Sequence, residues 1–294
     1  MAKYKGEILM LITALMWGSG FIGMDIGLQY LTVLQLMAGR FTVAAIILCI
    51  VFRKKLALIS RSVLWKGAVL GSILFLAFVI QTYGLLYTTP SKNAFLTALN
   101  VIFVPLLAYI IYKRRFDRFE ISAAVMALIG IGFLSLQGSM TMNIGDILSI
   151  LCALVFAFDI FYTNVFVKKE DALALTIVQF ITAAFLSVVT AAMLGELTLD
   201  VPAEGMYAIL YLAVFCTVIA YVCQNVGMQY ANPTKSAIIL STEALFGTIL
   251  SVIILHELLT GRMIVGCILI FAAILLAEIK PTFKRKKDMA VESS

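Results

Sequence analysis

The sequence predicts an all-α integral membrane protein with ten transmembrane helices, arranged as two inverted-topology five-helix repeats around a central cavity. Of its 294 residues, 63% are hydrophobic and 13% are charged, and the mean hydropathy is +1.07. A soluble domain of this length could not cover so much apolar surface with so few polar groups. The apolar runs are each about 20 residues long, the length of helix that crosses a bilayer core. A fourteen-residue motif also occurs twice, which indicates an internal duplication.

Ten apolar runs are expected to cross the membrane. They cover roughly residues 8–28, 33–52, 66–88, 90–112, 119–137, 144–167, 173–195, 206–231, 233–255 and 261–279. The first run is full length and has no small-residue cleavage site, so we expect it to remain as a helix and not to be removed as a signal peptide.

The basic residues predict the orientation of these helices. With the N-terminus inside, all but three of the 22 Lys and Arg residues fall in cytoplasmic segments. Such a bias predicts that both termini are cytoplasmic and that the protein lies in the inner (plasma) membrane. The net charge of +6 is therefore interpreted as a topology signal in contact with the lipid bilayer, and no nucleic-acid partner is expected.

The repeated motif divides the chain into two halves. Residues 81–94 read QTYGLLYTTPSKNA and residues 224–237 read QNVGMQYANPTKSA, so both follow Q-x-x-G-x-x-Y-x-x-P-x-K-x-A at an offset of 143. Thr89 or Asn232 is expected to cap a helix that begins at the following proline. Earlier segments match at an offset of 139, where Arg40-Phe41 lies on Gln179-Phe180.

This duplication has a geometric consequence. Five spans is an odd number, so the second half should enter the membrane in the opposite sense, which is typical of transporters with a substrate site between the halves. We expect a first repeat over 1–140, a second over 141–280, and a basic cytoplasmic tail over 281–294.

Several short segments resemble the drug/metabolite transporter superfamily, and more narrowly a protein of two EamA domains. They are Trp17-Gly18-Ser19-Gly20-Phe21, Arg40-Phe41, the stretch AFLTALNVIFVPLLA around Asn100, and AIILSTEALFGTILSVIILHE around Glu243. The chain departs from the pattern at Ala244, where a proline is usual, and at Phe156-Ala157, where the W-G pair is missing. The resemblance implies ten helices around a cavity, secondary active transport and mostly export of small metabolites.

Three ionisable residues lie deep in predicted spans, where a charge is costly. Glu243 occupies the repeat position of Asn100, and it either binds a proton or a substrate amine or ties two helices together. Asp159 is either a proton relay or the structural partner of a basic group. For Arg40, a helix–helix tie or a topology role is favoured over contact with substrate.

Lys92 and Lys235 occupy equivalent positions in the two motif copies. Inversion would place them at opposite mouths of the cavity, so each is predicted to close a gate or to contact an anionic substrate. The alternative is that each lysine extends to the membrane interface.

Polar and aromatic residues at helical spacing complete the predicted substrate-binding set, which consists of Trp17, Gln81, Tyr83, Asn100, Tyr162, Tyr221, Gln224 and Glu243. A carboxylate, a lysine and aromatic groups would suit an amino acid or a similar zwitterion, and export of such a molecule is the predicted function. The open alternatives are drug-like cations, nucleobase derivatives or carboxylates, and a passive facilitator or channel.

No enzymatic constellation accompanies these residues. The single histidine, His256, has no H-E-x-x-H continuation, and the five cysteines form no C-x-x-C pair. We therefore expect no catalytic residues, no metal and no cofactor. The expected partners are a small-molecule substrate and protons, with a homodimer as an open alternative.

Overall fold

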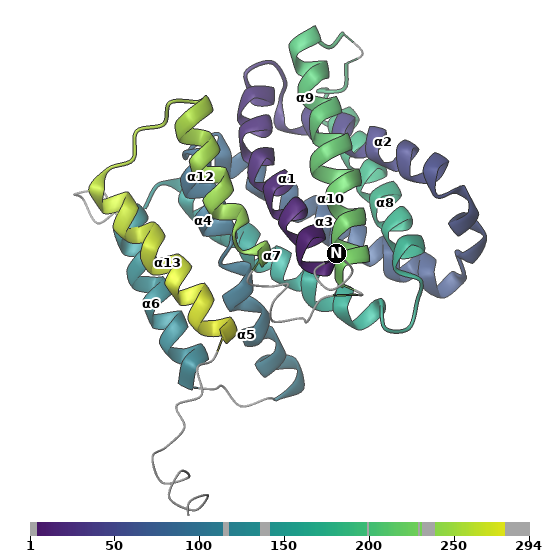
Figure 1. Cartoon of the computed structure of the whole chain (residues 1–294). Helices are drawn as coiled ribbons and strands as arrows, with labels where there is room; N and C mark the ends of the chain where they lie inside the picture. The colour runs from purple at the N-terminus through teal and green to yellow at the C-terminus, as the bar shows by residue number, and fades with distance from the viewer. Residues whose placement is uncertain are drawn as a thin grey trace, which may run out of the picture.

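The structure of the protein is a computed structural model that describes residues 5–113, 118–135, 142–198, 200–228, 230 and 239–279. The predicted gate residue Lys235 and the predicted cap Asn232 lie outside these residues. The described chain folds as a bundle of helices and contains no strand (Figure 1).

The described helices fall into two halves of the chain. In the first half they are α1 (Lys5–Leu28), α2 (Val33–Val51), η2 (Arg53–Leu58), α3 (Arg61–Leu85), α4 (Pro90–Thr97), α5 (Asn100–Tyr112) and α6 (Arg118–Ser135). In the second half they are α7 (Ile144–Phe166), α8 (Ala172–Met193), α9 (Ala203–Ala213), η3 (Val214–Ile219), α10 (Ala220–Met228), α12 (Glu243–Ile254) and α13 (Gly261–Ile279).

Seven helices of the described chain are long and apolar enough to cross a membrane. Three shorter apolar helices, Ile121–Leu134, Glu243–Ile254 and Gly261–Leu276, lie where further spans were predicted. Large apolar side chains such as Ile50, Leu128 and Ile268 are exposed on the outside of the bundle, where lipid would contact them. The chain is therefore a multi-pass membrane protein.

Polar side chains start several helices by accepting hydrogen bonds from backbone N–H groups that have no partner within the helix. Thr89 accepts from Lys92 N, and Pro90 follows at the first helical position, so the predicted cap in the first motif copy is confirmed. Thr32, Ser60 and Asp171 cap α2, α3 and α8 in the same way.

Two of the predicted spans are interrupted. The run 90–112 is broken at Ala98–Leu99 into α4 and α5. The run 206–231 contains the π-helix η3 between α9 and α10, where Thr217 Oγ1 donates to Leu212 O five residues earlier. Both interruptions lie next to the cavity described below.

Helices at equivalent positions of the repeat pack against each other. Phe41 on α2 contacts Phe180 on α8, with ring centroids 6.0 Å apart. The start of α2 meets the end of α8, where Gln35 Nε2 donates to Glu196 O, and the far end of α2 leads to Lys55, which pairs with Asp171 before α8. The two helices therefore run antiparallel.

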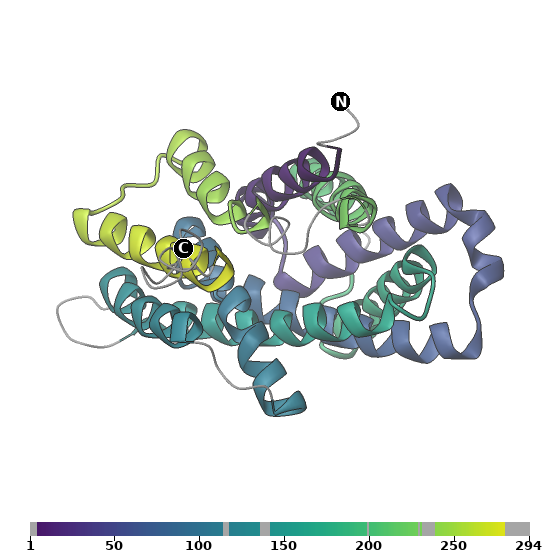
Figure 2. The same ribbon diagram turned by 60° about the horizontal axis from the view of Figure 1, so that its bottom comes forward.

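The last helices of the two halves pack in the same manner. Figures 1 and 2 both show α6 and α13 side by side. A Cβ added at Gly130 would lie 2.8 Å from Ile270 Cγ1 and 3.1 Å from Gly266 O, and one added at Gly266 would lie 2.7 Å from Leu134 N. Position 130 thus meets 270 while position 134 meets 266, so this pair is also antiparallel.

Candidate functional site

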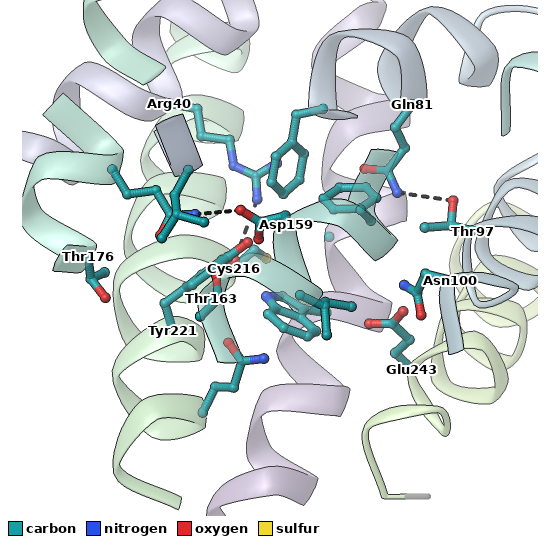
Figure 3. Close-up of a pocket in the computed structure, with 18 of the residues that line it drawn as sticks. Arg40, Gln81, Thr97, Asn100, Asp159, Thr163, Thr176, Cys216, Tyr221 and Glu243 are labelled. Atoms are coloured by element: carbon teal, nitrogen blue, oxygen red, sulfur yellow. Dashed lines mark hydrogen bonds between the residues drawn. The ribbon is translucent and has the colours of Figure 1, made fainter. Parts of the chain in front are cut away.

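A cavity of about 270 Å³ lies between the two halves (Figure 3). Its lining combines aromatic rings, amides, hydroxyls and three ionisable groups. The lining residues that bear on the argument are Trp17, Arg40, Phe78, Gln81, Thr97, Asn100, Phe156, Asp159, Thr163, Thr176, Gln179, Cys216, Tyr221, Gln224 and Glu243. A mostly apolar pocket with a few convergent polar groups is the usual form of a small-molecule site.

One side of the cavity is formed where α5 and α12 begin. Asn100 is the first residue of α5 and Glu243 the first residue of α12, and Figure 3 shows the two side chains on the same side of the cavity. A helix N-terminus carries a partial positive charge, so its first turn is a favourable place for a carboxylate. The turns at residues 98–99 before α5 and 241–242 before α12 therefore bring two equivalent polar residues to the site.

Gln81 on α3 extends this side. Its Nε2 donates to Thr97 Oγ1 at 3.2 Å, while its buried Oε1 has no hydrogen-bond partner within the described part of the protein. A buried polar atom without a partner is costly unless a ligand or water satisfies it. Gln81 thus offers an acceptor to a molecule in the cavity.

The opposite side carries Arg40 from α2. Its side chain is only 2% exposed, and its Nε donates to Thr217 Oγ1 at 2.8 Å. The π-helix η3 presents Thr217 at this point. The guanidinium carbon also lies 4.3 Å from the centroid of the Phe78 ring, within the range of a cation–π contact.

Asp159 from α7 lies on the same side of the cavity as Arg40 (Figure 3). Its Oδ1 accepts a hydrogen bond from Gln179 Nε2 at 2.9 Å. Gln179 occupies the repeat position of Arg40, so equivalent residues of α2 and α8 both reach this site. Among the described residues, the site therefore contains one cation, Arg40, and two carboxyl groups, Asp159 and Glu243.

Aromatic rings separate the two polar sides. Trp17 on α1 packs edge-on against Tyr221 with centroids 5.4 Å apart, and Tyr221 packs against Phe180 at 4.9 Å. Phe78 and Phe156 form a further edge-on pair at 5.1 Å. Trp17 Nε1 is buried without an acceptor in the described part of the chain, so it offers a donor.

Beyond the part of the cavity lined by Gln81 and Thr97, buried polar contacts join α4 to the start of α7. Lys92 Nζ lies 3.6 Å from Asp146 Oδ2, and both side chains are buried. Thr88 Oγ1 donates to the other oxygen of Asp146, and Asn93 Nδ2 donates to Ser149 Oγ at 3.0 Å. The cavity lining reaches Gln81 and Thr97 but none of these contacts.

A second carboxylate holds the same end. Glu257 Oε2, in the segment after α12, accepts hydrogen bonds from the backbone N–H and hydroxyl of Ser91 at 3.2 and 2.7 Å, and from Ser251 Oγ. The first turn of α4 is thus tied to α7 on one side and to α12 on the other.

At the other end the cavity lining continues to Val167 and Ala172, which border the loop between α7 and α8. This loop is tied to α3 and η2 by charged groups. Hydrogen bonds from Lys66 and Ser62 lower the pKa of the Glu170 carboxyl below its ordinary value. Burial tends to raise the pKa of Asp171, but hydrogen bonds from Lys55 and Ala174 N lower it overall.

The structure brings most of the predicted binding residues together but not all of them. Trp17, Gln81, Asn100, Tyr221, Gln224 and Glu243 line the cavity, and so does Asp159, which was predicted as a proton relay or a structural partner. Tyr83 instead borders an outer pocket that includes Glu196. Tyr162 lies in an aromatic cluster with Phe158, Phe161 and Phe166.

The sequence did not indicate that Gln179 and Thr217 would hold the charged groups of the site. For Arg40 it favoured a helix–helix tie or a topology role over contact with substrate. Arg40 does tie α2 to η3, but it also lines the cavity. The repeat offers a signal for Gln179, because it aligns with Arg40 at an offset of 139. No signal in the sequence identifies the π-helix that presents Thr217.

Comparisons with known proteins give one family model and relatives that are named as transporters. The model of the EamA-like transporter family matches residues 4–136 and 143–278. An "Uncharacterized transporter" of Archaeoglobus fulgidus is 30% identical over 278 residues, which cover 95% of this chain and 87% of that protein. The "Uncharacterized transporter YoaV" of Bacillus subtilis is 21% identical over 282 residues, which cover 93% of this chain and 96% of that protein.

A crystal structure of another protein has a similar fold. It superposes with a TM-score of 0.67 at 17% sequence identity, covering 95% of this chain and 98% of that chain. At this identity the likeness concerns the fold alone.

Proposed function

The chain belongs to the EamA-like transporter family, and on this premise we propose that it moves a small organic metabolite across the cytoplasmic membrane by alternating access. One observation carries the proposal: both halves line a cavity that extends to the α7–α8 loop, and buried polar contacts join α4 to α7 beyond its other end. We propose that these contacts close the pathway on one side only, which is the arrangement that alternating access requires.

The proposed architecture is a pair of inverted repeats, over 1–140 and 141–280, that rock about the cavity. It is supported by the antiparallel packing of equivalent helices, α2 on α8 and α6 on α13. It is also supported by reciprocal contacts, which a two-fold relation requires. A Cβ added at Gly84 would lie 3.2 Å from Gly145 O, and one added at the equivalent Gly227 would lie 3.3 Å from the equivalent Gly6 O.

Lys92 is proposed as the gate of the closed end. Its ammonium meets the carboxylate of Asp146 between α4 and α7, so separating these helices breaks a buried ion pair. Lys235, at the equivalent position of the second half, is proposed to close the other end when the halves rock. Contact of Lys92 with substrate is not supported, because the residue does not line the cavity.

The proposed cargo is an amino acid or a similar zwitterion, moved outward. The cavity holds carboxyl groups of both Asp159 and Glu243, which suit an ammonium. Among the described residues its cation is supplied by Arg40 and not by Lys92. Glu243 is proposed to exchange a proton for the cargo, since a carboxyl in a site that faces each side in turn couples the two movements. Asp159 is the second candidate for this role.

Transport in proteoliposomes tests the proposal. Each vesicle preparation is loaded with one unlabelled amino acid, and it should take up the same amino acid in labelled form by exchange, with saturable kinetics. An imposed pH gradient should change the net flux of that amino acid. A channel or passive facilitator would give flux that ignores the pH gradient. The absence of exchange for every amino acid, amine, nucleoside and carboxylate tested would contradict transport of this kind.

A further inference from the structure

We infer that Arg40 is the anion-binding group of the cavity, and that the transported molecule carries a carboxylate which the guanidinium holds. This inference rests on the proposed transport function and specifies its substrate class. It also excludes purely cationic cargo, which the composition of the cavity otherwise permits.

No carboxylate of the described protein lies within ion-pair distance of Arg40. None of the three ion pairs among the described residues includes it, although its side chain is only 2% exposed. A buried cation without a counter-charge is costly. An anion that enters the cavity would supply the missing charge.

The donors of Arg40 are only partly used. A guanidinium has five N–H groups, and the Nε–H is taken by Thr217. The terminal nitrogens have only long contacts, 3.5 Å to Cys216 O and 3.8 Å to Met24 Sδ, and a thioether is a weak acceptor. The terminal N–H groups therefore retain capacity for a carboxylate, which is the planar two-oxygen partner that arginine prefers.

The guanidinium is also held in place before any ligand arrives. Thr217 accepts its Nε–H, and the Phe78 ring lies 4.3 Å from its central carbon. Thr217 is itself oriented by its hydrogen bond to Leu212 O across the π-helix. Because this orientation is fixed in the folded protein, little conformational entropy is lost when an anion binds.

The other charged groups of the cavity favour a carboxylate over a phosphate. Asp159 lies on the side of Arg40 and accepts from Gln179, and Glu243 lies across the cavity (Figure 3). Two carboxyl groups would repel a phosphate dianion. A carboxylate that is accompanied by an ammonium instead places its negative group on Arg40 and its positive group near Asp159.

The first test uses matched ligands on the unmodified, detergent-purified protein. The probes are the twenty common L-amino acids and a set of simple monocarboxylates, each paired with its amide, together with the amines obtained by removing the carboxylate. Thermal stabilisation as a function of concentration gives the affinity of each. We expect at least one carboxylate to bind about tenfold or more tightly than its own amide, since a charged hydrogen-bond partner is lost in the amide.

The second test alters the guanidinium. Arg40→Gln should weaken binding of that carboxylate by about tenfold or more and should leave binding of its amide nearly unchanged. Thr217→Val keeps the charge and the shape but removes the acceptor that orients it, so a smaller loss is expected even where Arg40→Gln folds poorly. Lys66→Gln removes a cation outside the cavity and serves as the matched control.

The outcomes separate the two proposals. Equal affinity for a carboxylate and its amide, or stabilisation by amines alone, would overturn the role of Arg40. Vesicle exchange would then still test whether the molecules that bind are transported. A carboxylate that binds through Arg40 but is never exchanged across vesicles would contradict the transport function and leave the anion site standing. Wild-type affinity for the carboxylate in both Arg40→Gln and Thr217→Val would overturn the inference.

Discussion

The two halves of the protein use the same helices but place different chemistry in the cavity. Gln81 and Gln224 are equivalent and identical, and both line it. Three other pairs of equivalent lining positions differ in charge: Gly20 and Asp159, Arg40 and Gln179, and Asn100 and Glu243. Among the described lining residues, the first half thus contributes the cation and the second half both carboxyls, so a duplicated scaffold forms a site that can orient a molecule with two different ends.

The halves also differ in how closely their first helices approach a neighbour. Gly18 on α1 touches the backbone of α12, whereas the equivalent position on α7 is Ala157, which packs beside Leu107 and Phe161. The glycine of the first half is therefore required by close packing. Substitutions at positions that differ between the halves test where their equivalence holds and where it fails.

Gly18→Ala makes the first half resemble the second and should have the largest effect. The new Cβ would lie 2.7 Å from Glu243 O and 2.8 Å from Gly247 N, and backbone atoms cannot move aside cheaply. We expect a loss of about 1–3 kcal/mol in the free energy of unfolding, with loss of transport, because α1 and α12 both line the cavity. Thermal unfolding in detergent measures the first and vesicle exchange the second.

Gly261→Ala is the control for this change, since a Cβ there meets nothing within 4 Å. Equal melting temperatures for the two variants would refute the role of close packing.

Glu243→Gln removes the charge difference between the α5 and α12 positions. We expect the acceleration of flux by a pH gradient to fall by about tenfold or more, while exchange at equal pH persists. Adding Asn100→Asp to this variant moves the carboxyl to the first half and should restore part of the pH response. A pH response in Glu243→Gln that equals the wild type would remove Glu243 from the coupling.

Lys92→Gln breaks the contact that is proposed to close one end of the cavity. It leaves the Asp146 carboxylate buried without its cation, which disfavours the closed arrangement. In a variant that retains only Cys152, whose side chain is fully buried between α4 and α7, we expect labelling by a water-soluble maleimide to rise several-fold. Lys66→Gln in the same background is the control, and unchanged labelling of the Lys92 variant would argue against a gate.

The ion pairs at the α7–α8 loop should give the smallest effect. The lowered pKa of Glu170 means that its carboxylate stabilises the folded state at neutral pH, and that this contribution is lost as the pH falls below 4.5 through the folded-state value. Lys66→Gln should reduce the melting temperature slightly at pH 7 and should change it less at pH 4. The pair is near the surface, where such contacts contribute little, so a large loss at pH 7 would contradict this reading.

The sequence predicts the helices well because length and hydropathy alone decide which segments cross a bilayer. It also predicts that Asn100 and Glu243 share a cavity, since the repeat assigns them equivalent positions. It does not predict which side of α7 faces inward, so Asp159 lines the cavity while Tyr162, three residues later, does not. A membrane-spanning helix can be apolar on every side, including the exposed side that carries Ile147 and Leu151 in α7, so its sequence has no polar face from which to predict its orientation.

The role of Arg40 was beyond the sequence for a different reason. A basic residue in a span is equally compatible with a helix tie and a ligand site until its partners are known. Here the deciding observations are the hydrogen bond that Arg40 Nε donates to Thr217 and the lack of any carboxylate within ion-pair distance of Arg40 among the described residues. Both depend on packing between α2 and η3.

The π-helix η3 gives the eighth predicted span one place where its length can change. Each π-helical turn holds one residue more than an α-helical turn, so deleting one residue between 214 and 219 would let the turn close as ordinary α-helix, and Tyr221 and Gln224 would keep their orientation relative to α9. The same deletion within α9 or α10 would rotate everything beyond it by about 100°. The segment would still be apolar and would still insert, yet its functional face would point elsewhere.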